Sequence, residues 1–278
     1  MALEPSGANA EQIELWNGEM AQNWASMQEA LDRLLAPLGQ RVLEAAHVVP
    51  GERVLDLGCG CGDSVLAIAA RGARVTGVDI SEPMLERARE RTAGLDGVVL
   101  MLADAALYPF EPVYDLIFSR FGAMFFAEPV TAYANLGRAL RPGGRLCLLC
   151  WQAPEHNPWL AVPGAAAQAL LPPQPAVDLR APGPFAFAQP EWVREVLERA
   201  GFREVALEPV KQVLSLGGSL DEAMEFVTRV GPVSRILREL SADQRPAILG
   251  AVRGALEPYA RAGAVELGAA CWIVSATR

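Results

Sequence analysis

Three closely spaced glycines and an acid beside them are the residues of this chain whose spacing first indicates chemistry. In the segment Asp56-Leu57-Gly58-Cys59-Gly60-Cys61-Gly62, a glycine stands at every second position and the acid lies two residues before the first of them. Glycine has no Cβ and adopts backbone angles that other residues avoid, so a ligand can lie directly against such a backbone. The segment therefore predicts a ligand-binding loop whose contacts come from Asp56, Gly58, Gly60 and Gly62.

The residues around this loop predict a strand before it and a helix after it. Val54, Leu55 and Leu57 form the apolar run of a buried parallel strand. Asp63-Ser64 then offers side-chain oxygens to cap the first turn of a helix. Dinucleotide-binding proteins carry a related loop with the spacing G-x-G-x-x-G. Because Asp63 occupies the position where that pattern needs glycine, the spacing disfavours a dinucleotide.

Two further predicted strands also end in an acid, the first at Asp79 and the second at Asp104. Ligands of open parallel sheets bind outside the carboxyl ends of the strands, so Asp56, Asp79 and Asp104 are expected to gather around one crevice. Each oxygen of a carboxylate can accept a hydrogen bond from one hydroxyl. Since nucleoside-binding α/β folds place an acid at this point, we expect Asp79 to bind the two hydroxyls of a ribose.

The D-x-G-x-G-x-G run at residues 56–62 resembles the first motif of the class I S-adenosylmethionine-dependent methyltransferases. D-L-I-F at residues 115–118 and L-R-P-G-G-R-L at residues 140–146 are similar to later parts of the same pattern, so the resemblance covers about residues 51–151. It implies an S-adenosylmethionine-dependent methyltransferase that releases S-adenosylhomocysteine and acts on a small molecule. Within this family, the sequence most resembles methyltransferases that act on quinone precursors and natural products.

The resemblance also implies roles for residues at the strand ends. Asp104 would accept a hydrogen bond from the adenine amino group, and the backbone at Ala105 would contact the ring. Adenine would pack on Ile80, which follows the carboxylate of Asp79. Ser119, at the exit of the fourth predicted strand, is a further expected cofactor contact.

Cationic and aromatic side chains are the predicted contacts of the methyl acceptor. Arg120 follows Ser119 at the exit of the fourth strand, and we expect both to face the crevice, where Arg120 would meet an anionic group. Aromatic side chains indicate a largely apolar acceptor, and the candidates are Trp24, Phe121, Trp151 and Trp159.

The two histidines are the candidates for a general base, which is needed only where the acceptor must lose a proton. His156 follows the exit of the fifth predicted strand and is the candidate that could face the substrate, with an ordinary loop residue as the alternative. His47 lies in a helix before the first strand and is expected to be structural.

Strands and helices alternate from residue 51 to residue 151, which favours an α/β fold with a doubly wound, mostly parallel sheet. The resembled family has seven strands in a Rossmann-like arrangement. We expect the last of them over residues 269–276, antiparallel at the sheet edge and preceded by a helical insertion.

We expect the chain to divide into an N-terminal helical cap over residues 1–50 and a methyltransferase domain over residues 51–278, with plain core packing as the alternative interpretation of the cap. Lid segments are expected near residues 152–190, which are rich in proline and aromatic residues, and near residues 217–263. Within the cap, the first ten residues are expected to be loose. An apolar stripe from Met20 to Leu38 predicts one amphipathic helix, and a second short helix is expected over about residues 40–46.

Composition limits the partners. The net charge is −9 with Lys and Arg spread thinly, so no basic stripe indicates nucleic-acid binding. No apolar run reaches the roughly 20 residues of a membrane span and the N-terminus lacks a leader pattern, so we expect a cytoplasmic protein without membrane contact. Cys147 and Cys150 are three apart on a predicted strand and face opposite ways, so no metal is expected. The oligomeric state stays open.

Two other functions remain as alternatives. The first is a non-catalytic or regulatory protein that retains the S-adenosylmethionine-binding fold, and the formation of S-adenosylhomocysteine in the presence of candidate acceptors would separate it from an enzyme. The second is a dinucleotide oxidoreductase, which the spacing of the glycine loop already disfavours.

Overall fold

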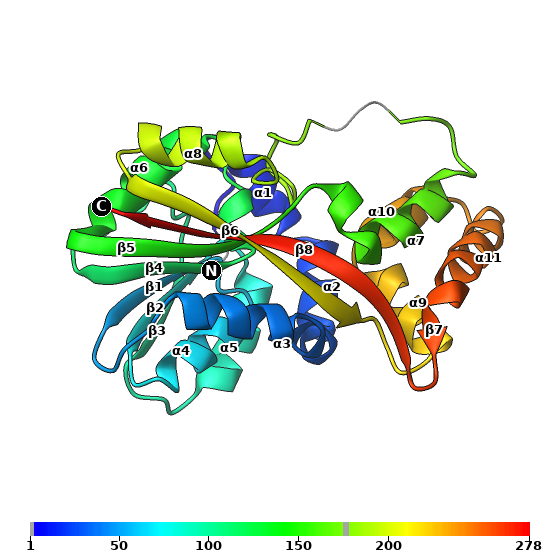
Figure 1. The fold of residues 1–278 in the computed structure, drawn as a ribbon, viewed down its shortest axis with the longest axis horizontal. Coiled ribbons are helices and arrows are strands. Elements are labelled where there is room, and N and C mark those ends of the chain that lie inside the picture. The colour runs from blue at the N-terminus through cyan, green and yellow to red at the C-terminus, as the bar shows by residue number, and fades with distance from the viewer. Residues whose placement is uncertain (1–2, 175–177) are drawn as a thin grey trace.

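The computed structural model describes residues 3–174 and 178–278. Residues 1–2 of the predicted cap and residues 175–177 of the predicted lid segment lie outside the described residues. Seven strands form one sheet in the order β3-β2-β1-β4-β5-β8-β6, and the short β7 pairs with β8 outside this path (Figure 1). The strands are β1 (Arg53–Leu57), β2 (Arg74–Asp79), β3 (Val98–Leu102), β4 (Tyr114–Arg120), β5 (Leu140–Trp151), β6 (Arg203–Ser215), β7 (Ala260–Arg261) and β8 (Ala264–Thr277).

The first five strands are parallel to one another, and β8 is antiparallel to both of its neighbours. The predicted doubly wound, mostly parallel sheet is therefore confirmed, and so is the direction of its last strand. Its predicted place at the edge is wrong, because β6 lies outside β8 and forms the edge itself.

Helices cover both faces of this sheet (Figure 1). α3 (Gln28–Ala45), α4 (Asp63–Ala69) and α5 (Glu82–Thr92) lie on one face, and α6 (Pro129–Ala139) and α8 (Pro190–Arg199) lie on the other. The apolar runs of β1 and β4 are consequently buried from both sides, as expected for central parallel strands. Leu55 and Ile117, for example, are fully buried.

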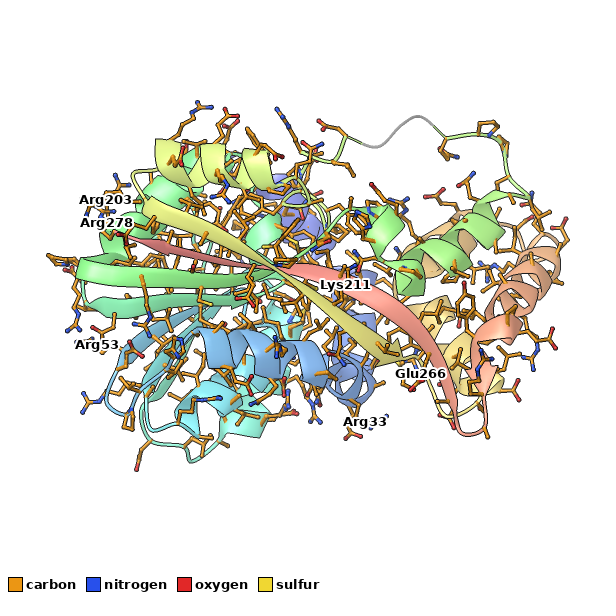
Figure 2. All side chains as sticks on the ribbon, viewed as in Figure 1. Arg33, Arg53, Arg203, Lys211, Glu266 and Arg278 are labelled. Carbon is orange, nitrogen blue, oxygen red and sulfur yellow. The ribbon has the colours of Figure 1, made fainter. Side chains whose placement is uncertain are left out.

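The strands β6 and β8 continue past the end of β5 as a two-stranded ribbon (Figure 1). Figure 2 marks this ribbon, with Arg203 and Arg278 at its sheet end and Lys211 and Glu266 along its course away from the sheet. The far end carries a group of four helices that we call the helical lobe. Its members are α7 (Pro158–Gln168), α9 (Leu220–Arg229), α10 (Pro232–Glu239) and α11 (Arg245–Leu256).

The two predicted lid segments meet in this lobe. α7 comes from the first segment and packs against α10 and α11 of the second. The contact between α7 and α10 is close, since a Cβ built on Gly164 would lie 3.0 Å from Cγ of Pro232.

A single buried asparagine closes the point where β5 leaves β8. The last residue pair of the two strands is Trp151 with Cys271. Beyond it, Asn157 Oδ1 accepts a hydrogen bond from Ala270 N at 3.0 Å, and Asn157 Nδ2 donates to Ala270 O at 3.1 Å. Ala270 O also accepts a hydrogen bond from Gln152 N at 2.9 Å, so the carboxamide of Asn157 adds a second donor there and supplies the partner of the buried Ala270 N.

The N-terminal helices differ from the prediction. A short helix α1 (Ala10–Leu15) precedes α2 (Glu19–Ser26), and a break at Met27 separates α2 from α3. The predicted helices over 20–38 and 40–46 are therefore wrong in their boundaries, because α3 runs through both and contains Pro37. Proline costs one backbone hydrogen bond inside a helix. The burial of Leu34, Leu38 and Val42 along α3 offsets that cost.

Three short 3₁₀ helices complete the secondary structure, namely η1 (Gly122–Met124), η2 (Pro154–His156) and η3 (Glu257–Tyr259). Within the part of the chain that the structure describes, no helix has both the length and the apolar character to cross a bilayer.

Candidate cofactor and substrate site

The glycine loop connects β1 to α4 and has the backbone conformation that its spacing predicts. Gly58, Gly60 and Gly62 all have positive φ, at 65°, 52° and 83°. A Cβ on Gly58 would lie 2.7 Å from Cα of Gly122, so this glycine lets the loop touch η1 backbone to backbone. A Cβ on Gly60 would lie 2.8 Å from Cε of Met84. At Gly58 and Gly60, a side chain is therefore excluded both by the backbone dihedral angles and by the neighbouring atoms.

The prediction that Asp63 and Ser64 cap α4 is wrong. Gly62 stands at the capping position and no side chain caps the helix. The hydroxyl of Ser64 instead donates to Asp56 Oδ2 at 2.5 Å. Because Gly62, in the left-handed conformation, stands at the N-cap, α4 begins at Asp63, one residue earlier than a side-chain cap at Asp63 requires.

Asp56 is completely buried beneath the loop. Its Oδ1 atom has no hydrogen-bond partner among the described residues. Burial raises the pKa of Asp56 from 3.8 to about 7, and the hydrogen bond from Ser64 opposes part of that shift. A buried carboxylate oxygen without a partner costs stability, so Asp56 is suited to receive a donor from a ligand.

Asp79 and Asp104 lie at the same edge of the sheet, at the ends of the adjacent parallel strands β2 and β3. Asp79 accepts hydrogen bonds from Gly60 N at 2.7 Å and from Ser81 N at 2.9 Å, which ties the end of β2 to the glycine loop. Asp104 accepts from Asn9 Nδ2, at 2.9 Å to Oδ1 and 3.0 Å to Oδ2, and its Oδ1 also accepts from Ala106 N at 2.9 Å.

The other predicted cofactor contacts are held by internal hydrogen bonds. The backbone oxygen of Ile80 accepts from Asn17 Nδ2 at 2.8 Å, and that of Ala105 accepts from Asn135 Nδ2 at 3.0 Å. Ser119 is fully buried, and its hydroxyl donates to Leu57 O at 2.7 Å. These three residues form hydrogen bonds that hold the strand ends in place, and their contact with a cofactor stays a prediction.

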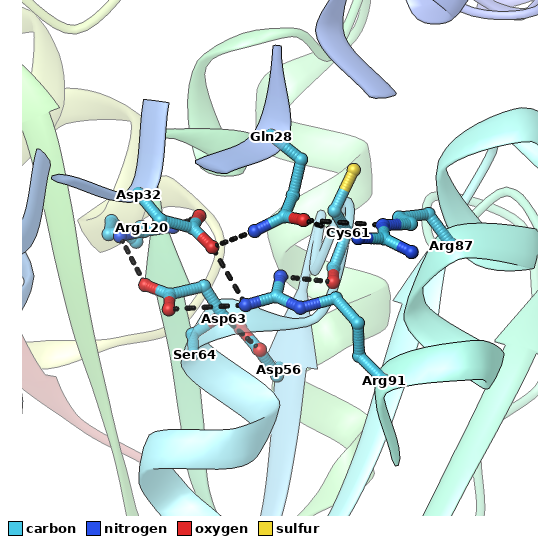
Figure 3. Close-up of polar contacts among 9 residues, drawn as sticks. All are labelled: Gln28, Asp32, Asp56, Cys61, Asp63, Ser64, Arg87, Arg91 and Arg120. Atoms are coloured by element: carbon cyan, nitrogen blue, oxygen red, sulfur yellow. Dashed lines mark hydrogen bonds and ion pairs between the residues drawn. The ribbon is translucent and has the colours of Figure 1, made fainter. Parts of the chain in front are cut away.

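Arg120 does not face the same crevice as Ser119, and that part of the prediction is wrong because neighbouring residues of a strand point to opposite faces. Its guanidinium pairs with Asp63 at 2.7 Å and lies 4.0 Å from Asp32 (Figure 3). An anionic acceptor group would have to displace these carboxylates. The role of Arg120 in substrate binding stays a prediction without a geometric argument in its favour.

Arg120 belongs to a chain of alternating charges that holds α3 over the glycine loop (Figure 3). Arg91 pairs with Asp32 at 2.7 Å and also donates to the loop oxygen of Cys61 at 2.7 Å. Its Nη2 lies 3.7 Å from Asp63, so two arginines and two aspartates alternate. Sequence reasoning missed this network, because its members lie on α3, α4, α5 and β4 and carry no common motif.

Three of the predicted substrate contacts form one aromatic stack, consisting of Phe121, Trp151 and Trp159. The rings of Phe121 and Trp151 are parallel within 7° at a centroid distance of 4.0 Å. Trp159, on α7, lies 5.1 Å from Trp151. Phe121 has a φ of 67°, an uncommon backbone conformation for a bulky residue. Because Trp151 belongs to β5 and Trp159 to α7, the stack joins the sheet to the helical lobe.

Two predicted contacts lie apart from this stack. Trp24 on α2 meets Trp16 edge to face at 5.6 Å, and Trp16 meets Phe125 at 5.4 Å. His156 ends η2 and is exposed. Among the described residues, no hydrogen bond or ion pair orients its side chain as a general base, so that role stays a prediction.

Comparison with known proteins finds similarity over the part of the chain that contains the glycine loop. A sequence model described as "Methyltransferase domain" matches residues 54–144. The chain is 42% identical over 111 residues to a demethylmenaquinone methyltransferase of Clavibacter sepedonicus, covering 40% of this chain and 45% of that protein. It is 37% identical over 114 residues to the enzyme of the same name in Staphylococcus aureus, covering 40% and 47%. The matches thus span about half the length of these relatives.

Solved structures show a similar fold. A Haemonchus contortus phosphoethanolamine N-methyltransferase 2 in complex with S-adenosyl-L-methionine aligns with a TM-score of 0.53 at 20% identity, over 87% of this chain and 52% of that chain. A putative methyltransferase from Bacillus halodurans aligns with a TM-score of 0.55 at 19% identity, over 86% and 97%. The predicted fold class and the predicted resemblance are both confirmed.

Proposed function

We propose that this chain, whose residues 54–144 belong to the methyltransferase domain family, transfers a methyl group from S-adenosylmethionine to a small, largely apolar molecule. The observation that carries the proposal is the glycine loop together with three acids at one sheet edge. The backbone N–H of Gly60 donates a hydrogen bond to the carboxylate of Asp79. Asp56 lies beneath the same loop, and its buried Oδ1 lacks a hydrogen-bond partner among the described residues.

These residues fit the chemical groups of the cofactor. The absence of side chains at Gly58, Gly60 and Gly62 suits the close approach of the methionine part, and Asp56 offers an acceptor to its ammonium group. Asp79 suits the ribose hydroxyls and Asp104 the adenine amino group, because carboxylates accept several hydrogen bonds. When bound, S-adenosylmethionine supplies an activated methyl group on its sulfonium.

The protein's own contribution is then placement and exclusion of water. Holding the acceptor in line with the methyl group can lower the barrier by roughly 7–11 kcal/mol. In the aromatic stack Trp151 and Trp159 are buried and Phe121 is partly exposed, so an acceptor would meet the Phe121 side of an apolar aromatic group, which favours a largely apolar acceptor. His156 would act as a base only for an acceptor that must lose a proton.

The N-terminal cap and the lobe complete the proposed site. α2 packs against α5 beside the glycine loop, and α7 brings Trp159 to Trp151. We assign residues 1–50 to a cap over the cofactor, and segments 152–190 and 217–263 to a lid over the acceptor. Closing such parts around ligands excludes water and strengthens the electrostatic contacts inside.

Calorimetry and a methyl-transfer assay test this function. S-adenosylmethionine and S-adenosylhomocysteine should bind, and NAD should not. Incubation with quinols, phenols and other small aromatic acceptors should release S-adenosylhomocysteine for at least one class. Binding without turnover of any acceptor would favour the non-catalytic protein, and binding of NAD alone would contradict the proposal.

A further inference from the structure

Helix α1 and its flanks place three residues on one face, at spacings of four. Asn9, Ile13 and Asn17 follow one another at this interval, which puts helical side chains on one side. Ile13 is 2% exposed and Asn9 is 6% exposed. The face is therefore buried against the carboxyl edge of the sheet, although the composition of this stretch indicates a loose terminus.

The two asparagines bind the ends of two neighbouring strands. Asn17 Nδ2 donates to Ile80 O at 2.8 Å, and its Oδ1 accepts from Glu82 N at 3.0 Å, both just after β2. Asn9 Nδ2 donates to Asp104 after β3, and its Oδ1 accepts from Ala127 N at 2.9 Å. Each carboxamide is held at both of its ends, so neither can turn freely.

The contacts of Asp104 with residues 3–174 and 178–278 leave room for one more donor. An ionised carboxylate has about four lone-pair sites. Asn9 contacts both oxygens and Ala106 N takes a second site on Oδ1, so the site that remains is on Oδ2. Asp104 keeps 9% of its surface exposed, so the residue is not completely sealed from solvent.

We propose that Asn9 is a positioning residue that sets the base preference of the cofactor site. It fixes the carboxylate of Asp104 so that the free site on Oδ2 accepts an exocyclic amino group. Adenine carries such a donor, whereas hypoxanthine carries a carbonyl oxygen at the same position and would meet the carboxylate with two acceptors and no hydrogen. This inference rests on the proposed function, since it assumes that Asp104 faces the base of the cofactor.

Titration calorimetry with S-adenosylhomocysteine and S-inosylhomocysteine tests the proposal. In the wild-type protein the adenosyl ligand should bind about 10- to 100-fold more tightly, as expected for a hydrogen bond to a charged group. Asn9→Ala frees the carboxylate to rotate and should reduce this ratio at least about fivefold. Asn9→Ser keeps a side chain suited to a helix start and should reduce the ratio by a similar factor while preserving α1.

Glu11→Ala is the matched control, because Glu11 is exposed on the same helix. It should leave both affinities and their ratio unchanged. If Asn9→Ser weakens both ligands equally and leaves the ratio intact, Asn9 serves only the fold and the inference is overturned. A wild-type protein that binds both ligands equally also overturns it, while the proposed function survives both results. Failure of the wild-type protein to bind either ligand removes the function and the inference together.

Discussion

Strand β8 passes through two different surroundings. From Cys271 to Thr277 it is paired with β5 on one side and β6 on the other, inside the sheet. From Glu266 to Ala270 it pairs with β6 alone, and the ribbon leads into the helical lobe (Figure 1). The glycine loop and the strand-end acids belong to the sheet, whereas Trp159 belongs to the lobe.

This difference separates the two sides of the proposed reaction. On the cofactor side, the glycine loop contacts the end of the next strand within 19 residues, as Gly60 does with Asp79, and the longer contact from Asn9 to Asp104 is added to this local core. On the acceptor side, α7 depends on α10 and α11 from a remote segment. We therefore expect substitutions in the sheet to change stability or cofactor affinity, and substitutions in the lobe to change methyl transfer at constant cofactor affinity.

The charge of Asp56 gives the largest expected effect. Its pKa rises from 3.8 in the unfolded chain to about 7 in the folded protein, so between these values the folded state holds a proton that the unfolded chain has lost. Stability therefore falls as pH rises from about 4 to 7, and above that range the cost is about 4 kcal/mol. Asp56→Asn has no charge to bury and should be more stable than wild type by up to this amount near pH 8.

Chemical denaturation at several pH values measures this difference. The gain of Asp56→Asn should become small near pH 4, where the folded wild-type protein is neutral at this site and the unfolded chain is only partly ionised. Asp96→Asn, at an exposed acid, is the control and should change little at either pH. A constant difference between wild type and Asp56→Asn across the pH range would show that the charge of Asp56 is not its cause.

Gly60→Val should abolish cofactor binding, with a loss of affinity on the order of 100-fold or more. The native φ of 52° disfavours a β-branched residue, and the new Cβ would lie 2.8 Å from Met84 Cε. Gly250→Ala in α11, where nothing lies within 4 Å of the added Cβ, is the control in the lobe. Cofactor affinity is measured by calorimetry on the folded variant. If Gly60→Val keeps the wild-type affinity, the glycine loop does not bind the cofactor.

Asp79→Ala should weaken cofactor binding by about 1.5–3 kcal/mol, the range for hydrogen bonds to a charged group. Asp79 also accepts from Gly60 N, so part of the loss will come from a looser loop. Asp79→Asn retains one acceptor oxygen without the charge and should fall between wild type and the alanine variant. Unchanged affinity in both variants, measured by calorimetry, would remove Asp79 from the site.

Trp159→Ala should reduce methyl transfer about tenfold while cofactor affinity stays within about twofold. It removes the lobe's ring from the aromatic stack, where it lies 5.1 Å from Trp151. Leu170→Ala, an exposed position just after α7, is the control. Steady-state kinetics combined with calorimetry would contradict the separation of the two sides if Trp159→Ala weakened the cofactor and left turnover intact.

The predictable parts of the molecule were those set by local sequence. The glycine spacing predicted the loop because positive φ at Gly58, Gly60 and Gly62 is a local property. The acids Asp79 and Asp104 could be placed because each directly follows an apolar strand, and parallel strands end at one edge. The lobe was predicted only as separate helical segments, since no local signal pairs α7 with α10.

The missed contacts join residues that are distant in the chain. Asn9 meets Asp104 across 95 residues, and Pro5, Gly7 and the small residues near Asn9 indicated a loose terminus. Asp63 was assigned to a helix cap, but the arginines that pair with it come from β4 and α5. Short polar side chains such as these can serve a cap, a turn or a tertiary contact, and only the fold decides among these uses.

The position of β8 between β5 and β6 also sets an order for folding during synthesis. Strands β1 to β5 can pair as consecutive βα units while the chain emerges from the ribosome. β6 is made next, but it has no neighbour in the sheet until β8 has followed, and the helices α9 to α11 lie between the two in the chain. Pairing β6 with β8 therefore requires closure of a long loop that contains most of the lobe. We expect strands β1 to β5, which carry the glycine loop, to fold first in a nascent chain. Until β6, β8 and the helical lobe have been made, β5 remains the exposed edge of this partial sheet.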